Sequence, residues 1–315
     1  MIGRGADVLR EVAERELDGA VARLRGASRL LVVGTGTSHH AAELGAGLLV
    51  AGGLDARAMS AASFAGAPDP VPGTAAIVIS HTGETAYALA ARARLQAAEV
   101  PLVTITGPSA GWPEAVVTPE REQSETYTVS YLAALAVLGR LAHALAGTPS
   151  GPEELVAVAD RVTEIIADPA IEHVPMPARA LALVGCGPWA VTAREGALKL
   201  REGARMLAEG FDAEALLHGA AVPYGPADGL VLVAPGADPD GLVAAVGAAA
   251  AAAGIPVSEL AEPAPPANDF LAQIPLTVRL QSLAARFARL RGTDPDTVIT
   301  GAWSERSLWA IGAPQ

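Results

Sequence analysis

The segment 194–218 reads REGALKLREGARMLAEGFDAEALLH and follows a short apolar run and the glycine turn GCGP (185–188). This order predicts a strand, a tight loop and a helix. On such a helix Glu195, Lys199 and Glu202 are spaced i, i+4 and i+7 and share one face. A row of this kind can be an ordinary solvated face with ion pairs. A functional face is favoured because Lys199 is the chain's only lysine and because α/β proteins bind ligands just after a strand–glycine–helix turn.

The composition limits the class of protein. A chain of 315 residues predicts about two domains, and a hydrophobic content of 51% suffices for a large core. The net charge of −12, with no basic run, argues against nucleic acid and membrane partners, which need clustered Lys and Arg. The single cysteine, Cys186, rules out an intramolecular disulfide and a cysteine metal cluster. The charged start (1–21) is helix-like rather than a signal peptide, and the longest apolar stretch (241–257) is mostly Ala and Gly, so we expect a soluble, cytoplasmic protein.

Apolar runs that alternate with helical patterns indicate the fold class. In the first half we expect helices at 4–27, 41–51, 86–98 and up to about 146, and strands at 30–33, 75–79, 101–106 and 115–118. In the second half we expect helices at 153–166, 191–208, 239–253 and 280–291, and strands at 180–184, 230–234, 256–260 and shortly before 280. Strands and helices that alternate at this spacing predict a doubly wound parallel sheet.

The segment TPSGP (148–152) is the clearest break in this pattern. We therefore predict an α/β protein with two tandem doubly wound parallel-sheet domains, 1–150 and 151–291. The remaining residues, 292–315, form a loop-like tail, and we expect its two tryptophans to hold it against the body.

Two hydroxyl-rich turns in the first half follow a predicted strand and precede a predicted helix: Gly36-Thr37-Ser38 and Ser80-His81-Thr82-Gly83-Glu84-Thr85. Free N–H groups and the helix dipole favour an anion at such a position. Ser and Thr are also common helix N-caps, which is the ordinary alternative. Two such turns, at the carboxyl ends of neighbouring parallel strands, favour a phosphate cradle. Neither turn is a Walker loop or a dinucleotide-binding GxGxxG fingerprint.

These motifs together resemble a known family, the double SIS (sugar isomerase) proteins, and in particular the isomerase half of glucosamine-6-phosphate synthase. The resemblance spans about residues 28–296. The two hydroxyl-rich turns are similar to the family's CGTS and SQSGET loops, and Ser124 to Thr128 lies where the family has its STK segment. The segment EGALKLRE (195–202) is nearly the family's EGALKLKE, Leu217-His218-Gly219 matches its KHGP histidine, and Ile274-Pro275-Leu276 with 291–296 is similar to its closing IPLQ…GTDVD stretch.

The resemblance implies flavodoxin-like SIS domains and a role for each motif. The residues that would bind the sugar phosphate are Thr37, Ser38, Ser80, His81, Thr82, Thr85 and Ser124. Glu202 would move a proton between C1 and C2 through an enediol-type intermediate, and such a base needs a raised pKa. Lys199 would pair with Glu202 or tune its pKa, and Glu195 would give structural support. His218 would assist ring opening and, in the family, comes from the partner subunit, which implies a homodimer.

Three departures from the family bear on the activity. No glutamine-hydrolysing domain precedes the isomerase half, so we do not expect glutamine-dependent amination. The position of the family's late Schiff-base lysine falls at Trp303, and an arginine could not replace that lysine because guanidinium stays protonated. The turn after His218 reads HGA rather than HGP.

The groups that remain are compatible with three functions. We expect a phosphosugar or aminosugar-phosphate isomerase/deaminase that acts on a 6-phosphate. The first alternative is a fructosamine-6-phosphate-type deglycase, which releases an amine. The second is a non-catalytic phosphosugar sensor, although no basic segment supplies a DNA-binding helix-turn-helix. We expect no cofactor, and no metal, because His39, His40 and His81 have no carboxylate or cysteine at ligand spacing.

Overall fold

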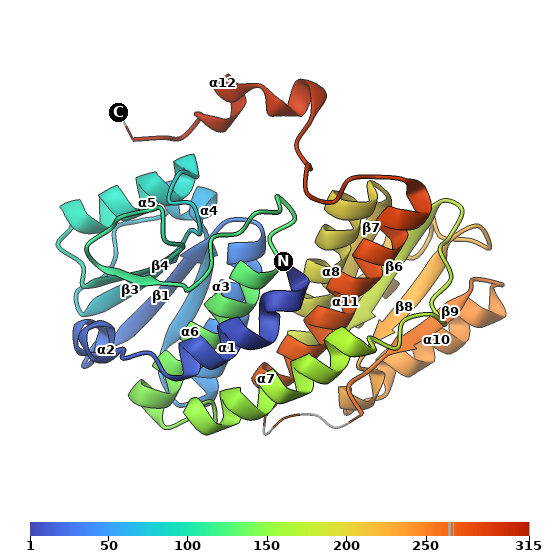
Figure 1. The fold of residues 1–315 in the computed structure, drawn as a ribbon, viewed down its shortest axis with the longest axis horizontal. Helices are drawn as coiled ribbons and strands as arrows, with labels where there is room; N and C mark the ends of the chain where they lie inside the picture. Colours follow the sequence, from blue (N-terminus) through green and yellow to red (C-terminus); the bar gives the residue numbers. More distant parts are fainter. Residues whose placement is uncertain (264–265, 267, 315) are drawn as a thin grey trace.

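The computed structural model describes residues 1–263, 266 and 268–314 as an α/β protein with two parallel sheets (Figure 1). The first sheet has the order β2-β1-β3-β4-β5, with strands Arg29–Gly34 (β1), Ala56–Ser60 (β2), Thr74–Ile79 (β3), Leu102–Thr106 (β4) and Ala115–Val117 (β5). The second has the order β7-β6-β8-β9, with strands Ala180–Gly185 (β6), Leu207–Asp212 (β7), Gly229–Val233 (β8) and Val257–Leu260 (β9). Every pairing is parallel, so the predicted α/β class is confirmed.

Helices cover both faces of the first sheet. They are α1 (Gly5–Ala13), α2 (Asp18–Leu24), α3 (Thr37–Ala51), α4 (Ala61–Ala65), α5 (Ala86–Ala97) and α6 (Val129–Ala146), preceded by the 3-10 turn η1 (Ile2–Arg4). Successive strand residues point to opposite faces, so Val32 packs with Leu135 of α6 in one cluster and Val33 packs with Phe64 of α4 in another. Burial on both faces explains why these strands are continuous apolar runs in the sequence.

The second sheet follows the same plan. Its helices are α7 (Pro152–Ala167), α8 (Pro188–Ala204), α9 (Ala213–Ala215), α10 (Leu242–Ala252) and α11 (Asp269–Arg291), with the irregular helical turns η2 (Leu216–Ala220) and η3 (Pro235–Ala237). Leu183 faces a cluster that α8 and α11 contribute to, whereas Val184 faces α9 and α10. Figure 1 shows α11 between the two sheets, with α7 running beneath both.

Helix α11 corrects one prediction, because the strand expected shortly before residue 280 does not exist. Residues 269–291 form a single helix that contains Pro275. Ile274 and Val278 pack into the core of the first sheet, and Leu276 and Leu280 pack into that of the second. A helix buried on two sides has an almost continuous apolar sequence, which periodicity alone cannot distinguish from a strand.

Two edge strands, β2 and β7, were missed. β2 lies between residues 51 and 75, where no strand was predicted, and β7 follows a helix that was expected to continue to residue 208. Helix α8 instead ends at Ala204, because Arg205 adopts a left-handed conformation with φ +49°. Edge strands are buried on fewer sides, so they lack the apolar runs that identified the central strands; Leu207 of β7 is exposed.

Two predicted helices differ at their ends or in continuity. The helix expected at 4–27 is divided into α1 and α2. The guanidinium of Arg140 on α6 caps the C-terminal end of α1, because it donates hydrogen bonds to the carbonyl oxygens of Val12, Ala13 and Arg15. The helix expected from residue 41 begins earlier, at Thr37. The hydroxyls of the first turn are therefore part of α3.

The tail crosses above the first sheet and ends near α5 (Figure 1). It contains the short helices η4 (Gly301–Ser304) and α12 (Arg306–Trp309). The prediction that its tryptophans hold it down is wrong, because Trp303 and Trp309 are 75% and 56% exposed. The tail is held instead by its backbone: Glu125 Oε2 accepts the N–H groups of Val298 and Ile299 at 2.6 and 2.9 Å.

Among the described residues, one helix, α6, is long and apolar enough to cross a membrane. However, 72% of it is buried inside the protein, where it packs against α1 and α3. Burial of this kind is typical of the core helix of a folded domain.

Candidate active site

A cavity of about 580 Å³ opens at the carboxyl ends of the strands of the first sheet. Its wall combines the two hydroxyl-rich turns, residues between 125 and 131, one face of α8 and several residues of the tail. The strand order reverses at this point, since β2 lies on one side of β1 and β3 lies on the other. Doubly wound sheets bind their ligands at such a position, and the volume lies in the range of small-molecule sites.

The two hydroxyl-rich turns occupy this edge of the sheet. Gly36, with φ +56°, is the N-cap of α3, so the next two residues form its first turn. Thr85 is the N-cap of α5, but its side chain makes no capping bond, and Thr82 Oγ1 accepts the N–H of Glu84 at 3.1 Å. Gly36 has no side chain with which to cap its helix, and that of Thr85 makes no such bond. The alternative that these Ser and Thr residues are only helix N-caps is therefore wrong. The hydroxyl-bearing residues of the two turns that line the cavity are Thr37, Ser38, Ser80, Thr82 and Thr85.

Three buried hydroxyls of the cavity wall have no hydrogen-bond partner in the described part of the chain: Ser80 Oγ, Thr106 Oγ1 and Tyr131 OH. Proteins rarely leave buried polar atoms unpaired unless a water, an ion or a ligand satisfies them. Burial raises the pKa of Tyr131 well above its ordinary value, so its hydroxyl keeps its proton. The wall therefore offers uncharged donors to an anion or to sugar hydroxyls.

His81 belongs to the same wall and carries no charge near neutral pH. Burial, and after it the charge of Arg121, lowers the pKa of His81 to about 4. Its Nε2 accepts the N–H of Glu122 at 3.0 Å, which leaves the proton on Nδ1. Gly83 makes the turn possible: its φ is +72°, and a Cβ there would lie 2.8 Å from that of Ala110.

Helix α8 brings charged groups to the opposite side of the cavity. Lys199 Nζ lies 2.8 Å from Glu202 Oε2 and 3.4 Å from Glu195 Oε1. The ammonium also donates to Thr37 Oγ1 at 2.9 Å and to the carbonyl oxygen of Thr126. The helical row predicted from the sequence is thus a buried network rather than a solvated face.

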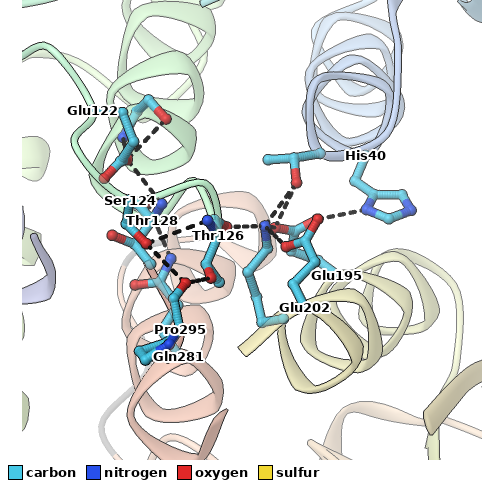
Figure 2. Close-up of polar contacts among 12 residues, drawn as sticks. His40, Glu122, Ser124, Thr126, Thr128, Glu195, Glu202, Gln281 and Pro295 are labelled. Atoms are coloured by element: carbon cyan, nitrogen blue, oxygen red, sulfur yellow. Dashed lines mark hydrogen bonds and ion pairs between the residues drawn. The ribbon is translucent and has the colours of Figure 1, made fainter. Parts of the chain in front are cut away.

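A histidine from the first half completes this network. His40 Nδ1 lies 2.6 Å from Glu195 Oε2, and Thr37 Oγ1 lies 3.2 Å from Glu195 Oε1. Figure 2 shows His40 beside Glu195 on one side of the network, and Thr126 on the other side, where its carbonyl oxygen accepts the hydrogen bond from Lys199. We refer to His40, Thr37, Glu195, Lys199, Glu202 and Thr126 as the charge network.

The two glutamates have opposite pKa shifts because their surroundings differ. Burial raises the pKa of Glu202, Lys199 opposes this only in part, and the result lies above the ordinary value. Burial also acts to raise the pKa of Glu195, but Lys199 and His40 outweigh it, so that pKa is lowered. For Lys199, the two carboxylates outweigh burial and raise its pKa. A pair of carboxyl groups whose pKa values are separated in this way is suited to acid–base chemistry.

The predicted site residues separate into three groups. Thr82 and Glu202, which belong to different halves of the chain, line the same cavity. Glu195 and Lys199 are buried behind its wall. Ser124 and His218 lie elsewhere: Ser124 Oγ donates to the carbonyl of Pro295 at 3.2 Å, and His218 is exposed on η2, with Nδ1 2.9 Å from Glu214 O.

Sequence reasoning did not assign a role to several residues of the site. His40 was considered only as a metal ligand, yet it contacts Glu195 across 155 positions. Tyr131 and Trp309 line the cavity but lie in no motif identified from the sequence, and Glu125 lies in the segment 124–128 but was given no role. Only the fold brings these residues together, although every residue from 124 to 128 carries a hydroxyl or a carboxylate and so marked that segment as polar. Within the described residues, no group of three or more His, Cys, Asp or Glu side chains could hold a metal ion.

The fold is shared with enzymes of phosphosugar metabolism. The chain matches tagatose-6-phosphate ketose/aldose isomerase from Escherichia coli with a TM-score of 0.82 and 18% identity over 96% of both chains. It matches glucosamine-6-phosphate deaminase from Thermotoga maritima with a TM-score of 0.77 and 21% identity, over 94% of this chain and 95% of that one. The C-terminal domain of glucosamine-fructose-6-phosphate aminotransferase from Francisella tularensis gives a TM-score of 0.73 and 20% identity, over 94% and 96%.

By sequence, no protein-family profile and no curated protein matches the chain. The structural matches confirm the predicted resemblance to the isomerase half of glucosamine-6-phosphate synthase at the level of the fold. They extend over nearly the whole chain, including both sheets.

Proposed function

We propose that this chain is an enzyme that acts on an amine-bearing 6-phosphosugar, as an aminosugar-phosphate isomerase/deaminase. One observation carries the proposal: the hydroxyl-rich turns and the desolvated carboxyl group of Glu202 face one cavity of about 580 Å³. The phosphate would bind the hydroxyls and helix N-terminal N–H groups of α3 and α5. The opened end of the sugar would then reach Glu202.

In the proposed reaction Glu202 is the base. It removes the proton from the carbon next to the carbonyl or imine carbon of the open-chain sugar, which gives an enediol or enaminol. Return of that proton to the neighbouring carbon completes the isomerisation, and hydrolysis of the resulting imine releases the amine. A raised pKa favours this role because the same group must accept and return a proton near neutral pH.

The charges of the cavity favour a substrate that carries an amine. Its described wall contains the carboxyl groups of Glu125 and Glu202, and it contains no lysine or arginine. Tyr127 and Trp309 add aromatic rings, which also attract cations. The uncharged sugar part of a ketose phosphate would gain nothing from these groups, whereas an ammonium would be stabilised by them. The same observation favours the deglycase alternative, in which the amine carries a substituent that would lie against the apolar tail residues.

Replacing Glu202 with Gln tests the enzyme assignment against the sensor alternative. General acid–base groups contribute about 10²- to 10⁴-fold to turnover, so we expect a loss of this size in ammonia release from glucosamine 6-phosphate. Binding of the sugar, measured by calorimetry, should change little. Unchanged turnover would refute Glu202 as the base, and a wild-type protein that binds but converts no sugar phosphate would support the sensor. Parallel assays with fructose 6-phosphate and a fructosamine 6-phosphate separate isomerase, deaminase and deglycase.

We further propose that the chain consists of two tandem flavodoxin-like units divided near residues 148–152, and that the protein is cytoplasmic.

We also propose a homodimer in which the partner subunit's His218 assists ring opening. The dimer is supported by the position of His218, which is exposed and does not line the cavity of its own chain. Mixing the inactive variants Glu202→Gln and His218→Asn tests this, because a heterodimer would contain one intact site only if the histidine acts across the interface. No recovery of activity in a verified heterodimer would exclude the exchange.

A further inference from the structure

His40 is a partly buried titratable group that the proposed reaction does not use. It lies in the first turn of α3, its side chain is 13% exposed, and it does not line the cavity. Its Nδ1 lies 2.6 Å from Glu195 Oε2, and the side chain of Glu195 is 1% exposed. A short contact between a histidine and a carboxylate in such a dry environment is a strong, charge-assisted hydrogen bond. His40 therefore contacts no substrate and interacts with the site through Glu195.

The contacts continue from Glu195 to the proposed base. Glu195 Oε1 lies 3.4 Å from Lys199 Nζ, which lies 2.8 Å from Glu202 Oε2. Two carboxylates thus share one ammonium, and the shorter contact is the one to Glu202. A fully buried carboxylate needs compensation by donors or cations. His40 supplies this compensation to Glu195, which leaves Lys199 close to Glu202.

We propose that His40 is a positioning residue: by donating its Nδ1–H to Glu195, it keeps Lys199 on Glu202 and so holds the base in its working orientation. This inference rests on the proposed function of Glu202. Because an ionised carboxylate only accepts hydrogen bonds, the proton of His40 lies on Nδ1 in both its neutral and its charged form. The network requires this donor, and it does not require His40 to change its charge.

Variants of His40 separate donation from packing. The amide of Asn can donate from nearly the position of Nδ1, whereas Leu fills similar space without a donor. For His40→Leu we expect Lys199 to move toward Glu195 and kcat to fall by roughly tenfold to a hundredfold, with KM nearly unchanged. His40→Asn should retain most of the activity. His39→Leu is the matched control, because His39 is the adjacent residue on α3 and its carboxylate neighbour is Glu43, at 3.9 Å, outside the charge network.

The pH profile provides a readout that a merely structural role would not change. The charged and titratable groups around the His40–Glu195 bond come from three helices: His39 and Glu43 of α3, Tyr131 of α6, and Arg194, Lys199 and Glu202 of α8. With Lys199 drawn toward Glu195, Glu202 loses part of its stabilising cation. The acidic limb of kcat should therefore move to higher pH in His40→Leu and stay in place in His40→Asn.

Several outcomes would overturn the inference. These are unchanged kcat in His40→Leu, an equal loss in the Leu and Asn variants, or a rise in KM without a fall in kcat. If His40→Leu does not fold, nitrogen NMR of the wild-type histidines decides the matter, since a proton on Nε2 rather than Nδ1 of His40 would exclude the donation. The Glu202→Gln variant distinguishes the two proposals: if it retains turnover, the proposed function fails regardless of the result at His40.

Discussion

Replacement of Lys199 by Met would test whether the charge network is as buried as the structure indicates. Met keeps most of the length of the side chain and removes its charge. Removing one partner of a buried ion pair costs about 3–5 kcal/mol, because the remaining charge is left without compensation. Glu195 would keep the hydrogen bonds to His40 and Thr37, and the side chain of Glu202 is 19% exposed. We therefore expect a loss near the lower end, about 3 kcal/mol in the free energy of unfolding.

The assay is urea unfolding at neutral pH, followed by circular dichroism, for the wild type and the variant. The double variant Glu195→Gln/Lys199→Met is the control, and it should recover part of the loss because it removes one uncompensated carboxylate. A loss below about 1 kcal/mol would refute the reasoning, because solvated ion pairs contribute no more than that.

The pH dependence of this loss has a definite sign. In the wild type the lowered pKa of Glu195 means that its stabilisation is present above the unfolded pKa and disappears as the pH falls through the folded one. In the variant, burial without Lys199 would raise the pKa of both carboxyl groups, so the folded state would bind protons more readily than the unfolded state. The difference between the two proteins should therefore be largest near neutral pH. It should shrink first as the pH falls through the raised pKa values of the variant's carboxyl groups, above the ordinary value of about 4.3, and then as the pH falls through the lowered pKa of Glu195 in the wild type.

Three further results are expected. Thr82→Val should raise KM for a 6-phosphosugar by about tenfold with kcat unchanged, because one hydrogen bond to a charged group is lost. Thr82→Ser keeps the hydroxyl and should keep the wild-type KM. If the Val and Ser variants have the same KM, Thr82 does not bind the phosphate. Because burial raises the pKa of Glu202, the acidic limb of the kcat profile should lie above the ordinary glutamate value of about 4.3, and a limb at or below that value would contradict Glu202 as the base. Gly210→Ala should lower the free energy of unfolding by about 2 kcal/mol or more, because the new Cβ would lie 2.3 Å from the backbone nitrogen of Arg194; Gly225→Ala, where no atom lies within 4 Å, is the control for urea unfolding.

The sequence alone determined the parts of this protein that depend on local patterns. Central strands such as β3 and β6 are buried on both faces and appear as short apolar runs between glycine turns. The hydroxyl-rich turns and the row of Glu195, Lys199 and Glu202 were identified from spacing along the chain. For the same reason the edge strands β2 and β7 were missed, and the doubly buried helix α11 was mistaken in part for a strand.

Only the tertiary structure decided which of these groups work together. Glu195 and Lys199 are neighbours on one helix, but whether that face is solvated or buried depends on α3 and on the segment around Thr126, which lie far away in the sequence. The same contacts determine the pKa values of the two glutamates, because burial and neighbouring charges are properties of the packed state. Hydrophobic periodicity reflects how one element packs on its own core, whereas the contact between His40 and Glu195 exists only after α3 of the first sheet and α8 of the second have packed against each other.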